Sequence, residues 1–329
     1  MKKSVKARVL ALVVASLLLC GALTVAAVVG SPYETLKNAV LDALAYDNVT
    51  VEVQAVVTVN GEFYERQKMS SVYGSDSYLY YTFDKNGDPD GYFYQSKALN
   101  ISRSYLGADG TQWYEGYIHR QDSDYYRTSS FAVLTPEDRN SARLRFMELA
   151  VDALVGDLKN NITMSSSGGT RLIQGTLTES QVPELAKAGI DVLVEESGSR
   201  EYYNEDDPFN MPLKSLTINH LHGEAEVDSE GNLLSVDFYA KATAVNILGE
   251  TNVFECDFEV RFSGIGATEA ACPVPGAKQL LTPDYMKANF GGEYGVVYFT
   301  LNEDGSINAG SVTTTYPGET EKKIRCEGY

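Results

Sequence analysis

Several residue types that build catalytic and metal-binding sites are scarce in this chain. Its 329 residues include four cysteines, three histidines and one tryptophan. The sequence also lacks the G-x-S-x-G turn of serine hydrolases and the H-E-x-x-H helix of zinc proteases. These absences exclude the best-marked hydrolase classes, and no other motif predicts an enzyme.

The cysteines do not predict a disulfide framework. Three of them, Cys256, Cys272 and Cys326, follow residue 30, and they form neither a CxxC pair nor an even set. Cys256 lies in "FECDFEVRF", where apolar and charged residues alternate, so it is predicted to be a buried thiol on the core face of a strand. Pairing of Cys272 with Cys326 stays open.

Metal sites are also poorly supported. His220 and His222 share one face of a predicted strand, but no third ligand lies near them in the sequence. The segment "DKNGDPDG" from Asp84 to Gly91 resembles a calcium loop, yet Lys97 stands where that loop needs a bidentate glutamate. We therefore expect a hairpin turn there, with no metal, no cofactor and no catalysis.

Acidic residues outnumber basic ones by 45 to 27, which gives a net charge of −18. The first 30 residues hold four basic residues and no acid, so 23 basic and 45 acidic residues follow, a net charge of −22. Such a field repels nucleic acid and anionic lipid headgroups and attracts cations or basic partners. We expect no nucleic-acid partner, and the plainest role of the charge is solubility.

The amino terminus has the pattern of a membrane segment. Four basic residues precede 21 uncharged residues from Val9 to Val29, and about 20 such residues span a bilayer as a helix. The sequence predicts a single-pass anchor that meets the lipid bilayer through residues 9–29, with a cytoplasmic amino terminus and an extracytoplasmic domain at the cell membrane. The alternative is a cleaved signal peptide and a secreted protein.

A helix and then a sheet follow this segment. In "SPYE", Ser31 is a predicted N-cap, Pro32 the first helical residue, and Glu34 the end of a capping box. Alternation with period two begins near Val51, and the pair Asn60-Gly61 between alternating runs predicts a hairpin. Further strands are predicted over 77–84, 91–96 and 110–120.

Helical patterns then interrupt the strands. One spans 135–161, with Thr135 as N-cap and Phe146 and Leu149 at the start of its apolar stripe, and a second spans 180–196. Strands are predicted again over 171–178, 213–228, 233–245 and 254–262. This order predicts an α+β fold, in which helices pack against an antiparallel sheet.

Several phrases together resemble the LolA/LppX-like superfamily of lipoprotein carriers, in the anchored extracytoplasmic form of Gram-positive bacteria. They are "YETLKNAVLDAL" before the Asn-Gly hairpin, "VDALVGDLKNN" before "SQVPELAKAGIDVLVEE", and "VDSEGNLLSVDFYAKA". The likeness runs from about Ser31 to Gly266. The resemblance implies a curved antiparallel sheet, or half-barrel, with helices packed on its concave face and an apolar cavity that holds acyl chains.

The predicted domains combine these observations. Residues 1–30 form a cytoplasmic stub and a transmembrane anchor, 31–275 a half-barrel-like extracytoplasmic domain, and 276–329 a C-terminal extension with a short helix and a hairpin. A tethered chain and the residues after 275 depart from the pattern of soluble carriers. The four candidates to line a cavity are Leu79, Tyr81 and Phe83 on one strand face and Trp113 on a later strand, although an ordinary core would show the same alternation.

The predicted function is a membrane-anchored binding module, without catalysis, for an acyl or lipoprotein ligand or for an envelope protein partner. One alternative is an envelope sensor or regulatory ectodomain that acts through a membrane partner. Another is a surface-interaction protein that uses its tyrosine-rich sheet face, since 22 tyrosines occur in the chain.

Overall fold

A computed structural model of the chain describes residues 31–96, 99–106, 110–118, 162–182, 212–274 and 295–314. It also describes single positions or short runs between 131 and 149 and at 187, 282 and 284. Strands make up 57% of these residues.

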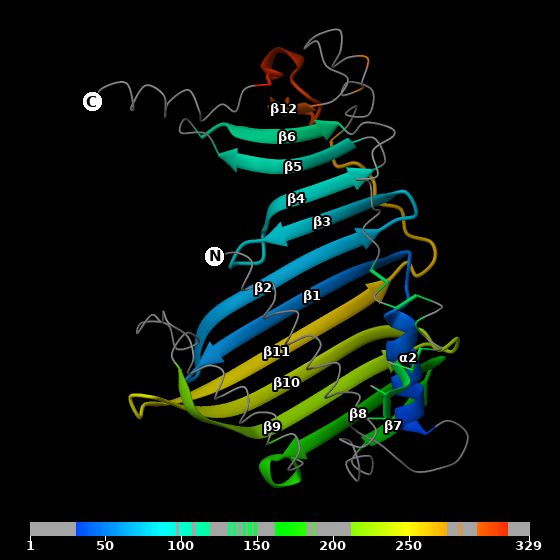
Figure 1. Ribbon diagram of the computed structural model, residues 1–329, viewed down its shortest axis with the longest axis vertical. Coiled ribbons are helices and arrows are strands. Elements are labelled where there is room, and N and C mark those ends of the chain that lie inside the picture. Colours follow the sequence, from blue (N-terminus) through cyan, green and yellow to red (C-terminus); the bar gives the residue numbers. More distant parts are fainter. Residues whose placement is uncertain are drawn as a thin grey trace. The chain divides into compact units, whose positions relative to one another are not determined.

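Twelve strands dominate the described part of the chain. Their bounds are β1 (Val49–Val59), β2 (Glu62–Tyr73), β3 (Ser77–Phe83), β4 (Pro89–Ser96), β5 (Leu99–Leu106), β6 (Gln112–Ile118), β7 (Ile162–Ser167), β8 (Thr170–Thr178), β9 (Leu213–Val227), β10 (Leu233–Asn246), β11 (Thr251–Ser263) and β12 (Gly295–Phe299). Hydrogen bonding orders them β12-β6-β5-β4-β3-β2-β1-β11-β10-β9-β8-β7 (Figure 1). Short 3₁₀ turns lie at η3 (Glu179–Gln181) and η4 (Ala309–Ser311).

The helix α2 (Pro32–Ala43) begins where the "SPYE" segment predicts it. The hydroxyl of Ser31 accepts a hydrogen bond from the Glu34 amide at 3.2 Å, and proline at the first helical position has no amide hydrogen that needs a partner. The buried face of the helix consists of Tyr33, Leu36, Ala39 and Ala43. The predicted start of this helix is confirmed.

The hairpin between β1 and β2 follows from its two turn residues. Asn60 and Gly61 have φ angles of 54° and 83°, and a two-residue turn with both angles positive matches the right-handed twist of its strands. Asparagine and glycine reach this left-handed region at the lowest steric cost. The hairpin predicted from the Asn-Gly pair is therefore confirmed.

Two other turns are closed by an aspartate at their first position. Between β3 and β4, one carboxylate oxygen of Asp84 accepts hydrogen bonds from the amides of Asn86 and Asp88 at 2.8 and 3.0 Å. Between β9 and β10, Asp228 accepts in the same way from the amides of Glu230 and Asn232, both at 2.8 Å. These side chains replace backbone acceptors in the turn, so the segment that resembles a calcium loop is a hairpin turn.

The chain divides into two compact units. Unit 1 comprises Met1–Tyr46, Glu52–Gln67 and Ala132–Phe262, and unit 2 comprises Asp47–Val51, Lys68–Phe131 and Ser263–Tyr329. Both units therefore combine segments that lie far apart in the sequence. The predicted boundary at residue 275 stays a prediction.

In unit 1, the two faces of the sheet differ sharply. One buried row crosses four strands through the paired residues Ile173, Ala225, Val236 and Val260. The neighbouring row, on the opposite face, consists of the paired residues Gln174, Glu224, Asp237 and Glu259. α2 packs against β7, β9 and β10, so burial of apolar surface under this helix stabilises the unit.

The core of unit 2 lies on one face of its strands. Its buried members are Leu79, Tyr94, Ile101, Ala270, Val274, Val297, Phe299 and Ile307. The segment after β11 covers this face and is held by hydrogen bonds from Asn48 Nδ2 to the Thr268 carbonyl at 2.7 Å and from Ser77 Oγ to the Ala270 carbonyl at 2.8 Å. A Cβ on Gly74 would lie 2.9 Å from the Ala270 nitrogen, so this close approach requires glycine.

The predicted α+β class, with helices packed on the concave face of a half-barrel, is wrong. The described chain is mostly one large antiparallel β-sheet with few helices. None of the helices in the described ranges is long and apolar enough to cross a membrane. The segment 9–29 lies outside those ranges, and the extracytoplasmic location at the cell membrane stays a prediction.

The predicted helix over 135–161 is described only in part. Asp138 accepts hydrogen bonds from the amide and hydroxyl of Thr135 at 2.9 and 2.8 Å, but position 138 is in a 3₁₀ turn and the described helical positions begin only at 142. There the hydroxyl of Ser141 accepts a hydrogen bond from the Leu144 amide at 3.1 Å, so the predicted start at Thr135 is wrong. Phe146 and Leu149, expected to face the core, are instead 71% and 60% exposed. The helical periodicity was a correct local signal, but at these two positions it does not mark core packing. The predicted segments 180–196 and 281–290 lie largely outside the described residues.

Candidate functional site

Of the four residues predicted to line a cavity, two belong to the core of unit 2. Leu79 is buried, and Tyr81 packs against the same cluster. The Tyr81 ring meets the Tyr92 ring edge-on at 6.3 Å, and Tyr92 stacks on Tyr114 at 6.1 Å. These side chains fill space between strands and the segments that cover them, as an ordinary core does.

The other two candidates lie elsewhere. Phe83 ends β3, with the ammonium of Lys68 4.6 Å from its ring centre. Trp113 neighbours Tyr114 on β6, and Tyr114 lies in register with the core residue Phe299. Because side chains alternate along a strand, Trp113 points to the face opposite that core. The structure therefore brings Leu79 and Tyr81 together and separates Trp113 from them.

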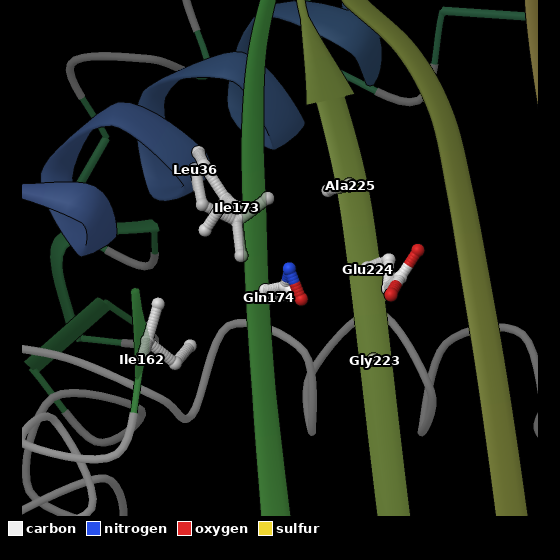
Figure 2. Close-up of a pocket in the computed structure, with 7 residues that line it drawn as sticks. All are labelled: Leu36, Ile162, Ile173, Gln174, Gly223, Glu224 and Ala225. Atoms are coloured by element: carbon white, nitrogen blue, oxygen red, sulfur yellow. The ribbon is translucent and has the colours of Figure 1, made fainter. Parts of the chain in front are cut away.

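A small pocket lies beneath α2 in unit 1. Leu36 of α2 and Ile173 of β8 meet over it, beside Ile162 of β7 (Figure 2). Its floor includes Gly223, which is paired with Gly175, so two opposed glycines leave the sheet without side chains there. The pocket has a cavity volume of about 10 Å³, whereas ligand pockets usually measure about 300–1,000 Å³. It is too small to enclose an acyl chain.

A second candidate is a hydrogen-bonded chain on the polar face of β8 and β9. Thr176 Oγ1 lies 2.8 Å from His222 Nδ1, and His222 Nε2 lies 3.1 Å from Glu224 Oε1. The order hydroxyl, imidazole and carboxylate is the one that activates a nucleophile in hydrolases. Sequence reasoning missed this set, although the His222-Glu224 spacing on one strand was a visible signal.

The surroundings do not suit this set to nucleophilic catalysis. The side chains of His222 and Glu224 are 37% and 39% exposed, so water is not excluded. β9 is paired on both sides, with β8 and with β10, and its backbone amides are therefore engaged in the ladder rather than aimed at a developing oxyanion. The three residues are better explained as a cross-strand polar network.

The polar face of unit 1 is acidic. Its strand residues include Glu224, Glu226, Asp237, Glu255, Asp257 and Glu259, against Lys241 and Arg261. Burial raises the pKa of Asp237, Arg261 at 3.6 Å opposes the rise, and the carboxylates of Glu259 and Glu224 add to it. In the described ranges, no group of three or more acidic, histidine or cysteine side chains is arranged to hold a metal ion. This face repels anionic partners.

The third candidate is an exposed apolar surface at one end of the unit 1 sheet. We call it the tip surface and define it as Phe63, Tyr64, Ile247 and Leu248, whose exposed fractions are 55%, 37%, 50% and 61%. Phe63 and Tyr64 begin β2 just after the Asn60-Gly61 turn, and Ile247 and Leu248 form the turn between β10 and β11. Figure 1 shows both turns at the same end of their strands.

Hydrogen bonds join the two turns of the tip surface. The Asn60 amide donates to the Val253 carbonyl at 2.8 Å, and the Val253 amide donates back to Asn60 Oδ1 at 2.9 Å. Asn60 Nδ2 also donates to Asn252 Oδ1 at 2.9 Å. Asn252 and Val253 are among the first residues of β11, so these bonds join the β1–β2 turn to the strand that leaves the β10–β11 turn. The sequence signal was the pair Ile247-Leu248 in a turn, where polar residues are the rule.

Comparisons with known proteins do not identify a family. No protein-family model and no curated protein matches the sequence. Among solved structures, a LolA superfamily protein from Nitrosomonas europaea is 8% identical, covers 78% of this chain and 100% of its own, and gives a TM-score of 0.17. A bifunctional dehydratase-cyclase domain in ambruticin biosynthesis is 14% identical, covers 70% and 79%, and gives 0.12.

The first of these proteins belongs to the superfamily that the sequence resembles. TM-scores this low carry no argument about the fold or the function of this chain, so a function has to rest on its own residues.

Proposed function

We propose that this protein is a non-catalytic binding module that takes an apolar partner, a lipid or a lipid-modified protein, at its tip surface. The observation that carries the proposal is the exposure of Phe63, Tyr64, Ile247 and Leu248 at the end of the unit 1 sheet where Asn60 is hydrogen-bonded to the start of β11. Single exposed apolar side chains are common on monomers, but large ones held together mark interaction sites.

The other sites support a surface rather than an enclosed ligand. The pocket beneath α2 is smaller than an acyl chain needs, and Leu79 and Tyr81 are packed in a core. The tyrosine-rich strands of unit 2 are less favourable as a binding surface, because Tyr78, Tyr80 and Phe93 are only half-exposed or less. Burial raises the pKa of Tyr78 well above the ordinary phenol value, in keeping with a ring that is mostly covered.

A photoreactive fatty acid that carries a diazirine on its acyl chain tests this proposal. The full chain is irradiated with this probe, and the labelled peptides are located by mass spectrometry, which separates the tip surface from every other apolar segment. We expect labels in the peptides that contain residues 60–66 and 244–251. The control is the double variant F146S/L149S, which removes two exposed apolar side chains that do not belong to the tip surface.

The double variant I247S/L248S should show about tenfold less labelling of the tips at a subsaturating probe concentration. About half of each side chain is already covered, so new burial of the remainder is worth about 1.5 kcal/mol for the pair. Labelling spread evenly over the chain, or lost equally in both double variants, would refute a binding surface at the tips.

A further inference from the structure

We propose that the partner of the tip surface is the headgroup region of a lipid bilayer with little anionic lipid, into which the two turns insert. This inference rests on the proposed function and names its partner. It is carried by the side chains of the tips, the hydrogen bonding of their backbone, their small area and their charge.

The types of side chain at the tips are those that the membrane–water interface favours. The aliphatic residues Ile247 and Leu248 occupy the turn itself, beyond the last residue of β10. The aromatic residues Phe63 and Tyr64 stand at the start of β2, which β1 separates from β11 in the sheet. Aliphatic side chains favour the acyl boundary, and tyrosine favours the headgroup level, where its ring is buried and its hydroxyl stays wet.

The backbone amides of the β10–β11 turn have hydrogen-bond acceptors within the protein. The amides of Leu248 and Glu250 donate to Asn246 Oδ1 at 3.0 and 2.9 Å, and the Gly249 amide donates to the Asn246 carbonyl at 3.0 Å. The Ile247 amide donates to the Pro212 carbonyl at 3.1 Å, and the Asn246 amide to the Glu250 carbonyl at 3.0 Å. Every amide from 246 to 250 is thus bonded within the protein. These amides therefore lose no water partner if the turn enters lipid.

The area of the tips suits a bilayer better than a protein. A stable protein interface buries about 800 Å² on each partner and involves about 20–30 residues. The tip surface has four exposed apolar side chains, two in a turn and two at the start of a strand, which is far fewer. A bilayer needs no complementary shape, so a few protruding side chains suffice to bind it weakly.

The charge near the tips sets the kind of bilayer. Glu62 and Glu65 are exposed on either side of Phe63 and Tyr64, and the Glu250 carboxylate is held by Asn246 Nδ2 at 2.8 Å. The adjoining polar face of β9–β11 carries more acids than bases. Anionic headgroups are therefore repelled, and insertion has to be driven by apolar burial on zwitterionic lipid.

Tryptophan fluorescence tests the insertion directly. Leu248→Trp and, as a matched control, Ser229→Trp each add one indole to the full chain. Ser229 is exposed in the turn at the other end of β10. Both variants and the parent, whose Trp113 gives the background signal, are mixed with phosphatidylcholine vesicles, either plain or brominated at carbons 6 and 7 of one acyl chain.

We expect the added emission of L248W to shift to the blue and to be quenched by the brominated lipid, while that of S229W does neither. Equal behaviour of the two variants overturns the proposal. If the diazirine fatty acid labels the tips but the indole at 248 is not quenched, the bilayer is refuted as the partner and the binding function stands. If the tips are not labelled and the indole is not quenched, both proposals fall.

Discussion

Removal of one hydroxyl, in Tyr46→Phe, should destabilise unit 1 measurably. Tyr46 follows α2, and its phenol oxygen accepts a hydrogen bond from the buried Leu233 amide at 3.1 Å. Its ring also meets Phe262 edge-on at 5.9 Å. Phenylalanine keeps the ring contact and leaves the amide of Leu233, which is 0% exposed, without this acceptor.

The expected loss of stability follows from the amide of Leu233, which loses its acceptor. An unsatisfied buried donor costs about 1–3 kcal/mol, and for a domain of this size each kcal/mol lowers Tm by about 2–4 °C. We therefore expect Tyr46→Phe to melt about 2–12 °C below the parent in a thermal scan followed by circular dichroism at pH 7. Tyr46→Leu, which also loses the edge-on ring, should melt lower still.

The same site predicts a dependence on pH. Burial raises the pKa of Tyr46, and the amide bond from Leu233 only partly opposes the rise. The folded phenol therefore keeps its proton when the unfolded one, with an ordinary pKa near 10, has lost it, and the parent loses stability as pH rises above about 10. The difference in Tm between parent and Tyr46→Phe should narrow there. Equal Tm values at pH 7 would refute the hydrogen-bond argument.

Three further predictions concern other parts of the chain. Burial raises the pKa of Cys256 to about 11, so its thiolate fraction at pH 8 is about a hundredfold below that of an ordinary thiol. Iodoacetamide should therefore alkylate Cys256 slowly, as followed by peptide mapping, and alkylation at the rate of a free thiol contradicts this. Asn60→Ala should lower the midpoint of urea unfolding more than Asn60→Gly does. Both variants lose the hydrogen bonds to β11, but only alanine is strained at a φ of 54°. Equal midpoints would show that backbone strain is negligible. Replacement of half the phosphatidylcholine by phosphatidylglycerol should weaken quenching of L248W, whereas stronger quenching would point to electrostatic binding.

The features that the sequence predicts best are those that neighbouring residues decide. The Ser31 cap, the Asn60-Gly61 turn and the Asp84 turn depend on hydrogen bonds and backbone angles within a few positions. Period-two alternation also assigns Leu79 and Tyr81 to the core face of their strand. It does not distinguish a core from a cavity, because both need the same apolar side chains.

The balance of helix and sheet could not be predicted in this way. The helical pattern predicted from Thr135 is present at described positions from 142 to 149, but Phe146 is exposed, so an apolar stripe did not imply a packed layer. Nor does alternation say which strands become neighbours, which is set by contacts between residues about 190 positions apart. The tip surface depends on such contacts, since the pairing of β1 with β11 and the bonds from Asn60 to Asn252 and Val253 bring its two turns to the same end of the sheet.

The place of β1 between β2 and β11 in the sheet has a consequence for the time course of folding. The bond from Val253 to Asn60 spans 193 positions, and that from Asn48 to Thr268 spans 220. At about 5–20 residues synthesised per second, the β1–β2 hairpin waits about 10–40 s for the strand that completes it. Throughout that interval β1 has an open edge that can pair with another chain. Expression at low temperature or with a chaperone should therefore raise the yield of monomer more than any change to the mature surface.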